Sequence, residues 1–366
     1  MDRSNWEYKK LGDICDKGSS NIAQNKIEDN TGDYALYGAS GYVKSIDFYH
    51  QEQPYIGVVK DGSGVGRANL YPAKSSLLGT MQYILPKKGC DLGYLLYVLQ
   101  GLHLEKYKTG AAIPHIYFKD YGKCEVPFPS LVDQQRIVAE LDCLNEMIAV
   151  KQEQLKEFDK LAQSIFYDMF GDPVANEKGW ETYKLGELGL LARGVSKHRP
   201  RNAPELLGGT MPLIQTGDVA NAEMFITTYN STYSDLGVAQ SKVWKAGTLC
   251  ITIAATIGKC AILSFDACFP DSVVGFMAES SKTNNEYMYF IFKRLQKILE
   301  MNAPAVAQKN INLAVLNALQ IPLPPLSLQQ QFAEKISAIE AQKELVKQSI
   351  AETQALLDYT TDKYFG

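Results

Sequence analysis

Two basic side chains stand directly after glycine-rich turns. Arg67 follows the turn at 61–66, Lys259 follows Gly258, and Lys60 precedes the first turn. A lysine or arginine on a turn can donate hydrogen bonds to phosphate oxygens or to the O6 and N7 atoms of guanine. These three residues are therefore candidate nucleic-acid contacts. For each of them taken alone, a solvated loop position is the alternative interpretation.

A basic run and an amide-containing loop add to this set. The run GVSKHRPR occupies 194–201, whereas its counterpart in the first half of the chain, around 17–20, carries far less charge. Because these two segments differ in charge, we expect the two halves of the chain to read different base sequences. Side-chain amides, which the later loop contains, pair with the N6 and N7 atoms of adenine. The candidate contacts are Arg193, Lys197, His198, Arg199 and Arg201 in and beside the run, and Gln308, Lys309 and Asn310 in the later loop.

Patterns of catalytic and cofactor sites are missing from the sequence. The step Gly258-Lys259 has Ile253 where a phosphate-binding loop needs glycine, and Cys260 where it needs serine or threonine. The four histidines form no HExxH pair, and no Gly-x-Ser-x-Gly elbow or Asn/Asp-Pro-Pro-Tyr/Phe motif is present. The seven cysteines contain no CxxC pair, so we predict reduced, mostly buried thiols and no metal site. The sequence predicts a binding protein that is not itself an enzyme.

The chain is a tandem repeat. The segment WEYKKLGDI at 6–14 returns as WETYKLGEL at 180–188, and the segment 126–171 aligns without a gap on 321–366, at an offset of 195. The second pair opens with VPFPSLVDQQ and IPLPPLSLQQ, and both copies end in Phe-Gly. Each repeat therefore consists of a variable part followed by a patterned part. We predict domains at 1–125 and 172–320, and long helices within 126–171 and 321–366.

The patterned parts predict long amphipathic helices. Their apolar residues alternate at spacings of four and three, which is typical of a coiled-coil seam interrupted by a few polar residues, Lys151 and Lys343 among them. Prolines precede both segments, and Gly171 with Pro173 ends the first. About 35 helical residues would extend roughly 50 Å. The seam residues that we expect to bind a partner protein are Ile137, Leu141, Leu144, Ile148, Leu155, Phe332, Ile336, Ile339, Val346 and Ile350.

The variable parts are predicted to mix strands with short helices. Segments 54–60 and 247–253 have the composition of strands that run into glycine turns, and 92–99 and 286–299 have helical spacing. The aromatic residues have mostly aliphatic neighbours, which favours core positions over base stacking. The predicted fold class is α+β, with two α/β domains separated by two long antiparallel helices in a pseudo-twofold arrangement.

Composition and charge place the chain among ordinary globular proteins. No stretch reaches the ~18 apolar residues of a membrane span, and the first residues lack the apolar core of a signal peptide, so a cytoplasmic location is expected. The net charge of −4 divides unequally, because each variable part carries +1 and the helical parts carry −4 and −2. Any DNA should therefore bind to the variable domains.

The two motifs together resemble the specificity subunit of type I restriction-modification systems. Each domain opens with Trp-x-x-x-Lys-Leu-Gly-Asp/Glu-Ile/Leu and ends in Pro-Phe/Leu-Pro-x-Leu-x-x-Gln-Gln before a long helix, and the resemblance covers the whole chain. The first domain departs from the pattern at Ile113-Pro114-His115, where the second has Gln308-Lys309-Asn310. That difference concerns only how this loop touches DNA.

The resemblance implies a role within a larger complex. Each domain would read one half of a split, asymmetric site in the major groove of double-stranded DNA. The helices would fix the unspecified spacer and dock two copies of an adenine-N6 methyltransferase subunit, and restriction subunits would join them. S-adenosylmethionine, ATP and magnesium would bind to those partner subunits and not to this chain. Without its partners the chain could self-associate through uncovered apolar positions.

Two other classes of function stay open at this point. A coiled-coil scaffold with two ligand-binding domains would show no salt-dependent affinity for DNA. A self-sufficient nuclease or methyltransferase is disfavoured by the missing motifs.

Overall fold

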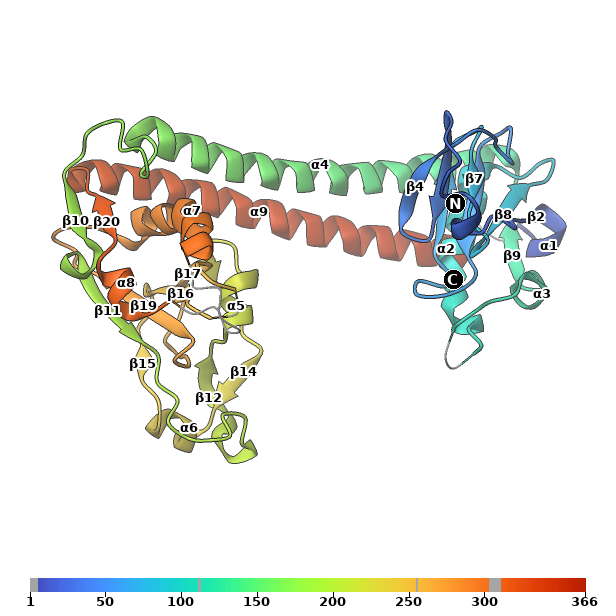
Figure 1. The fold of residues 1–366 in the computed structure, drawn as a ribbon. Helices are drawn as coiled ribbons and strands as arrows, with labels where there is room; N and C mark the ends of the chain where they lie inside the picture. Colours follow the sequence, from blue (N-terminus) through green and yellow to red (C-terminus); the bar gives the residue numbers. More distant parts are fainter. Residues whose placement is uncertain (1–5, 111–112, 255, 303–310) are drawn as a thin grey trace. The chain divides into compact units, whose positions relative to one another are not determined.

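The computed structural model describes residues 6–110, 113–254, 256–302 and 311–366 (Figure 1). These residues form two compact units. The first unit comprises Met1–Glu153 together with Lys347–Gly366, and the second comprises Gln154–Val346. The spatial division differs from the sequential one because each long helix contributes one half to each unit. None of the described helices is both long and apolar enough to cross a membrane.

The first unit contains three sheets. Strands β1 (Glu7–Lys10) and β9 (Glu125–Phe128) form an antiparallel pair at the ends of the domain. A four-stranded sheet has the order β2 (Cys15–Ser19), β8 (Met81–Pro86), β5 (Tyr55–Val59), β6 (Ala68–Tyr71), and a three-stranded sheet has the order β4 (Gly41–Ile46), β3 (Tyr34–Gly38), β7 (Ser76–Leu77). The helices of this domain are α1 (Leu11–Ile14), α2 (Leu92–Gly101) and α3 (Phe118–Tyr121), with short 3₁₀ turns at Gln24–Lys26 and Leu104–Tyr107.

The second unit repeats this plan. Strands β10 (Thr182–Lys184) and β20 (Gln320–Pro322) form an antiparallel pair that corresponds to the β1–β9 pair of the first unit. The larger sheet has the order β11 (Gly189–Arg193), β19 (Val273–Ala278), β16 (Leu249–Thr252), β17 (Cys260–Leu263), β13 (Phe225–Ile226), and the smaller has β14 (Ser231–Tyr233), β12 (Leu207–Leu213), β18 (Ala267–Cys268), β15 (Val243–Trp244). The helices are α5 (Thr216–Asn221), α6 (Asp235–Ala239), α7 (Asn285–Asn302) and α8 (Leu313–Asn317), with 3₁₀ turns at Leu185–Glu187 and Pro204–Leu206.

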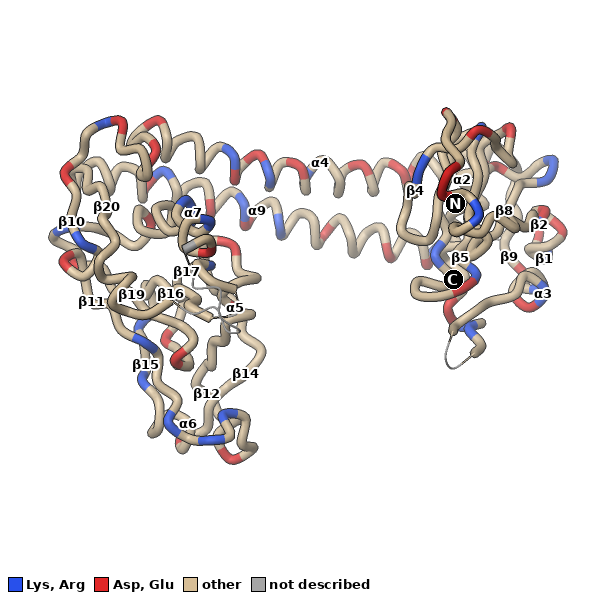
Figure 2. The backbone as a smooth tube through the Cα atoms, viewed as in Figure 1, with Lys and Arg blue, Asp and Glu red and all other residues tan. Residues whose placement is uncertain are grey.

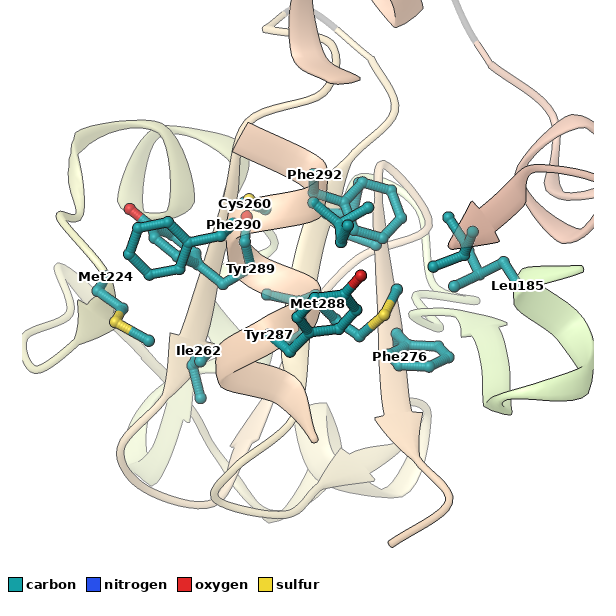
Figure 3. Close-up of a cluster of buried hydrophobic side chains, with 14 of the residues drawn as sticks. Leu185, Met224, Cys260, Ile262, Phe276, Tyr287, Met288, Tyr289, Phe290 and Phe292 are labelled. Atoms are coloured by element: carbon teal, nitrogen blue, oxygen red, sulfur yellow. Dashed lines mark hydrogen bonds between the residues drawn. The ribbon is translucent and has the colours of Figure 1, made fainter. Parts of the chain in front are cut away.

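The helix α7 packs across the larger sheet of the second unit. Its residues Tyr287, Met288 and Phe292 are buried together with Phe276 of β19 and Leu185, which Figure 3 shows in close-up. This is the main core of the unit, and it also takes in side chains from both long helices. The corresponding helix α2 packs in the same way in the first unit. The predicted helices at 92–99 and 286–299 are confirmed.

Both long helices are continuous over 40 residues, α4 at Leu131–Phe170 and α9 at Leu326–Phe365. They exceed the expected 35 residues because each continues through the phenylalanine of the final Phe-Gly of its repeat. Gly171 ends α4 with a φ of +76°, a left-handed conformation that favours glycine, and its N–H donates to the Tyr167 carbonyl at 2.8 Å. Within each unit the two helix halves run antiparallel. The first unit has the contacts Glu140–Tyr364 and Lys151–Thr353, and the second has Phe170–Phe332 and Asp159–Lys343, so residue numbers rise along one helix as they fall along the other.

The first glutamine of each Gln-Gln pair fastens a domain to its helix. Gln134 is fully buried; its amide Nε2 donates to the carbonyls of Gly89 and Pro129, and its Oε1 accepts from the Asp91 N–H. Gln329 is equally buried, donates to the carbonyls of Lys282 and Pro324, and accepts from the Thr283 hydroxyl. The shared motif therefore has a structural role at the junction of domain and helix.

Candidate nucleic-acid interface

The two glycine turns have the same backbone frame. In the first unit the Val59 N–H donates to the Arg67 carbonyl, and the Gly66 N–H to the Val59 carbonyl, each at 2.9 Å. In the second unit Thr252 makes the same pair of bonds with Lys259 and Gly258, again at 2.9 Å. Arg67 and Lys259 therefore hold equivalent positions, as the sequence predicts.

The side chains at the first turn are partly held by their neighbours. The exposed Arg67 guanidinium donates to the carbonyl of Ala39 at 3.0 Å and to that of Gly64 at 3.3 Å, which fixes its orientation. The Lys60 ammonium lies 3.2 Å from the Asp61 carboxylate, so its charge is balanced locally. The Gly62 N–H donates to the Pro114 carbonyl at 2.9 Å. The segment Ile113-Pro114-His115, which differs from the family pattern, therefore packs against this turn.

Lys259 faces a different environment. It is exposed and lines a cleft of about 570 Å³ between α4 and α7, together with Gln163 and the α7 residues Lys293 and Lys297. The two α7 lysines lie one helical turn apart and so share a face. The charged residues of α7 can be followed in Figure 2. Sequence reasoning missed Lys293 and Lys297, although their spacing of four within a predicted helix was the signal that could have found them.

The basic run folds back on acidic residues. Arg199 and Arg201 both pair with Asp271, and the His198 imidazole lies 3.7 Å from Glu205. The backbone N–H groups of Lys197 and His198 donate to the Gln240 side chain at 2.6 and 3.0 Å. The loop is thereby ordered, and much of its charge is balanced by carboxylates.

The predicted contacts form separate groups. Arg193 is half-buried near the end of β11, shortly before the run. The loop around Asp271 shares no residue with the cleft around Lys259. Gln308, Lys309 and Asn310 lie outside the described residues.

The seam residues lie largely inside the chain, so their assignment to a partner surface needs correction. Ile137, Leu141 and Phe332 are fully buried in the cores of their units, where α2 or α7 covers them. A heptad pattern shows that a helix face is covered but not what covers it. Of the whole set, Ile137, Leu141, Leu144, Ile148, Phe332, Ile336 and Ile339 are buried, and Leu155, Val346 and Ile350 are partly exposed.

The cysteines are free, and five of the seven are buried, in agreement with the expected reduced, mostly buried thiols; Cys124 is half-buried and Cys143 is exposed. Burial raises the pKa of the Cys15, Cys90 and Cys260 thiols to about 12, so that they stay protonated at neutral pH and are poor nucleophiles. Among the described residues no group of three or more His, Cys, Asp or Glu side chains could hold a metal ion.

Comparison with known proteins accounts for this architecture. The family model described as "Type I restriction modification DNA specificity domain" matches residues 3–158 and again 177–355. The chain belongs to this family. Specificity subunits recognise DNA sequence and are not catalytic. Because the family model matches twice, the repeat observed in sequence and fold is a repeat of the specificity domain.

Similar specificity subunits agree over nearly the full length. The type I restriction enzyme MjaVIII specificity subunit of Methanocaldococcus jannaschii is 22% identical over 375 residues, which cover 92% of this chain and 86% of the relative. The S subunit of the type I restriction-modification system from M. genitalium has a TM-score of 0.64 at 15% identity, covering 99% of this chain and 96% of its own. A chain from a study of complex assembly of the type I R-M system has a TM-score of 0.60 at 18% identity, with 99% and 97% covered. These solved structures share the fold of this specificity subunit.

Proposed function

We propose that the chain reads a split, asymmetric DNA site, with one half-site bound by each recognition domain. The observation that carries this proposal is the pair of glycine turns, which share one hydrogen-bonded frame but present different side chains. Arg67 is held by two carbonyls, whereas Lys259 lines a basic cleft with Lys293. The same backbone hydrogen bonds at each turn, combined with different side chains, suit two domains that recognise different DNA sequences.

The chain would work together with catalytic partners in the cytoplasm. Two adenine-N6 methyltransferase subunits would dock on it, restriction subunits would join, and S-adenosylmethionine, ATP and magnesium would be bound by these partners. The docking surface would lie on the exposed apolar side chains of the long helices and not on the buried seam. Those side chains are Met147, Val150 and Leu161 on α4, and Leu345, Leu356 and Tyr359 on α9. In the isolated subunit the same surface would favour self-association.

The adenine-methylation pattern of cells that express this chain with its methyltransferase partner tests the proposal. We expect a split motif with a fixed spacer. Exchange of residues 1–125 for another recognition domain should change one half of the motif and leave the other half and the spacer unchanged. The absence of a motif, or a motif that the exchange does not alter, would contradict the proposal and favour a scaffold without a role in DNA recognition.

The basic cleft of the second domain should contribute through phosphate contacts. Lys259→Gln and Lys293→Gln are each expected to weaken binding of DNA about equally for all sequences, and to reduce the slope of log affinity against log salt concentration by about one. Titration of the methyltransferase complex with duplex DNA at several salt concentrations measures both effects. Lys335→Gln, an exposed lysine on α9, is the matched control and should leave the slope unchanged. An unchanged slope in both cleft variants would place the DNA elsewhere.

A further inference from the structure

Lys343 is a buried charge in the second unit, at the place where α4, α9 and the recognition domain meet. Its side chain is 3% exposed, and its ammonium lies 2.8 Å from Asp159 on α4, 2.8 Å from Glu223, and 3.1 Å from Glu340 on α9. Glu223 belongs to the recognition domain, in the short connection between α5 and β13. One lysine therefore joins both helices of the pair to the domain that they carry.

The cluster depends on this lysine for its charge balance. Burial by itself would lower the pKa of Lys343, but the hydrogen bonds to Asp159 and Glu223 and the nearby Glu340 outweigh burial and hold the pKa above its usual value. Without the lysine, three carboxylates would face one another; the side chains of Asp159, Glu223 and Glu340 are 53%, 49% and 21% exposed. Their negative charges would then lose their compensation, and contact with solvent would moderate the repulsion between them.

The first unit has no such cluster at the equivalent positions. At the repeat offset of 195, Lys343, Glu340 and Asp159 correspond to Ile148, Asn145 and Gln354. The first domain is instead held by Tyr97 of α2, whose hydroxyl donates to Asp142 at 2.6 Å and accepts from Asn145 at 3.0 Å. The two repeats thus use different chemistry to fix a domain on its helices. The first uses hydrogen bonds around the Tyr97 hydroxyl, and the second uses ion pairs around the buried Lys343.

The position of Glu223 connects the cluster to the candidate DNA contacts. The neighbouring Met224 carbonyl accepts from the Ile262 N–H at 2.9 Å, and β13 pairs with β17 through Phe225–Ile262. Strand β17 begins at Cys260, directly after Lys259. Lys259 and Lys343 also line a common cleft. A shift of Glu223 would therefore move the strand that carries the glycine turn.

We propose that Lys343 is a positioning residue that holds the second recognition domain on the helix pair through Glu223, and that it thereby governs the reading of the second half-site alone. This inference rests on the proposed function for its DNA readout. It does not require any contact between Lys343 and DNA.

The test uses the full chain in complex with its methyltransferase partner and duplexes that carry single base-pair substitutions in either half-site. Lys343→Met is expected to reduce discrimination in the second half-site about tenfold and to leave the first half-site unchanged. Lys343→Arg keeps the charge and should restore discrimination. In the first unit, Tyr97→Phe is the matched variant and should affect only the first half-site. Tyr94 and Tyr287 donate to the carbonyls of the equivalent prolines 127 and 322, so α2 and α7 align at an offset of 193 and Phe290 corresponds to Tyr97.

One further variant separates a charge effect from a loss of packing. In Lys343→Met the carboxylates of Asp159, Glu223 and Glu340 repel one another without a cation between them. The variant Lys343→Met/Asp159→Asn/Glu223→Gln removes most of this repulsion and should restore discrimination in the second half-site, even if Lys343→Met alone does not fold.

The outcomes distinguish this proposal from the proposed function. Equal losses in both half-sites, or a Lys343→Met defect that neither arginine nor neutralisation of the acids relieves, would overturn the positioning role. If the wild-type complex recognises no split site, the proposed function fails, and amide hydrogen exchange still tests the role of Lys343. Lys343→Met should then speed exchange at Ile262 in the second unit and leave Tyr94 in the first unaffected, whereas unchanged exchange at Ile262 would refute the proposal.

Discussion

Replacement of Phe166 by alanine is expected to lower the free energy of unfolding of the second unit by about 3–5 kcal/mol. Phe166 is 1% exposed, and its ring lies 5.3 to 5.6 Å from those of Phe170, Phe290 and Phe332. These rings come from α4, α7 and α9, so a cavity here loosens three elements at once. Denaturation in guanidinium, followed by circular dichroism, measures the loss.

The same helix offers a matched control for this prediction. Leu161 lies five residues earlier on α4 and is 47% exposed. Leu161→Ala should change the free energy of unfolding by less than about 0.5 kcal/mol. Equal effects of the two variants would mean that the aromatic cluster does not hold α4 on the second domain.

Gln134→Leu is expected to destabilise the first unit by about 3 kcal/mol, because it leaves buried backbone groups without partners. The Asp91 N–H would lose its acceptor at 2.8 Å, and the carbonyls of Gly89 and Pro129 would lose donors at 3.1 and 3.0 Å. Asp91 caps α2, so the damage should extend to that helix. Thermal unfolding monitored by far-ultraviolet circular dichroism reports the change.

The second glutamine of the motif provides the comparison. Gln135 is exposed on α4, and Gln135→Leu should leave the free energy of unfolding nearly unchanged. If Gln135→Leu lowered the free energy of unfolding as much as Gln134→Leu, the hydrogen bonds of Gln134 would not explain the loss, and its proposed structural role would be contradicted. The exposure of Gln135 means that nothing within the described chain explains why the motif keeps a second glutamine.

The repeat and its elements were predictable because they depend on local signals. The glycine turns, the prolines before each long helix and Gly171 after the first one have direct backbone consequences, so the strands and helices they bound follow from the sequence. The equivalence of Arg67 and Lys259 also followed, since it required only counting from the turn.

The surroundings of individual side chains were not predictable in the same way. The heptad pattern identified Ile137 and Phe332 as covered, but a period cannot tell a partner protein from the chain's own helix α2 or α7. From the sequence, Lys343 was interpreted as a polar interruption of the seam. Its partner Glu223 lies 120 residues earlier in the chain, too far for a local pattern to connect the two. For the same reason the sequence did not reveal that Asp271 balances Arg199 and Arg201.

The division of the long helices between the two units has a consequence for how the chain folds during synthesis. The second unit is one continuous segment, Gln154–Val346, whereas the first unit is completed only by Lys347–Gly366. Tyr364 enters the core beside Ile137 and Leu141, and its hydroxyl donates to Glu140. At translation rates of about 5–20 residues per second, the nascent first domain would wait roughly 10–40 s for the segment that closes it. During that interval its half of α4 lacks its helical neighbour, so the domain made first would be the last to finish folding.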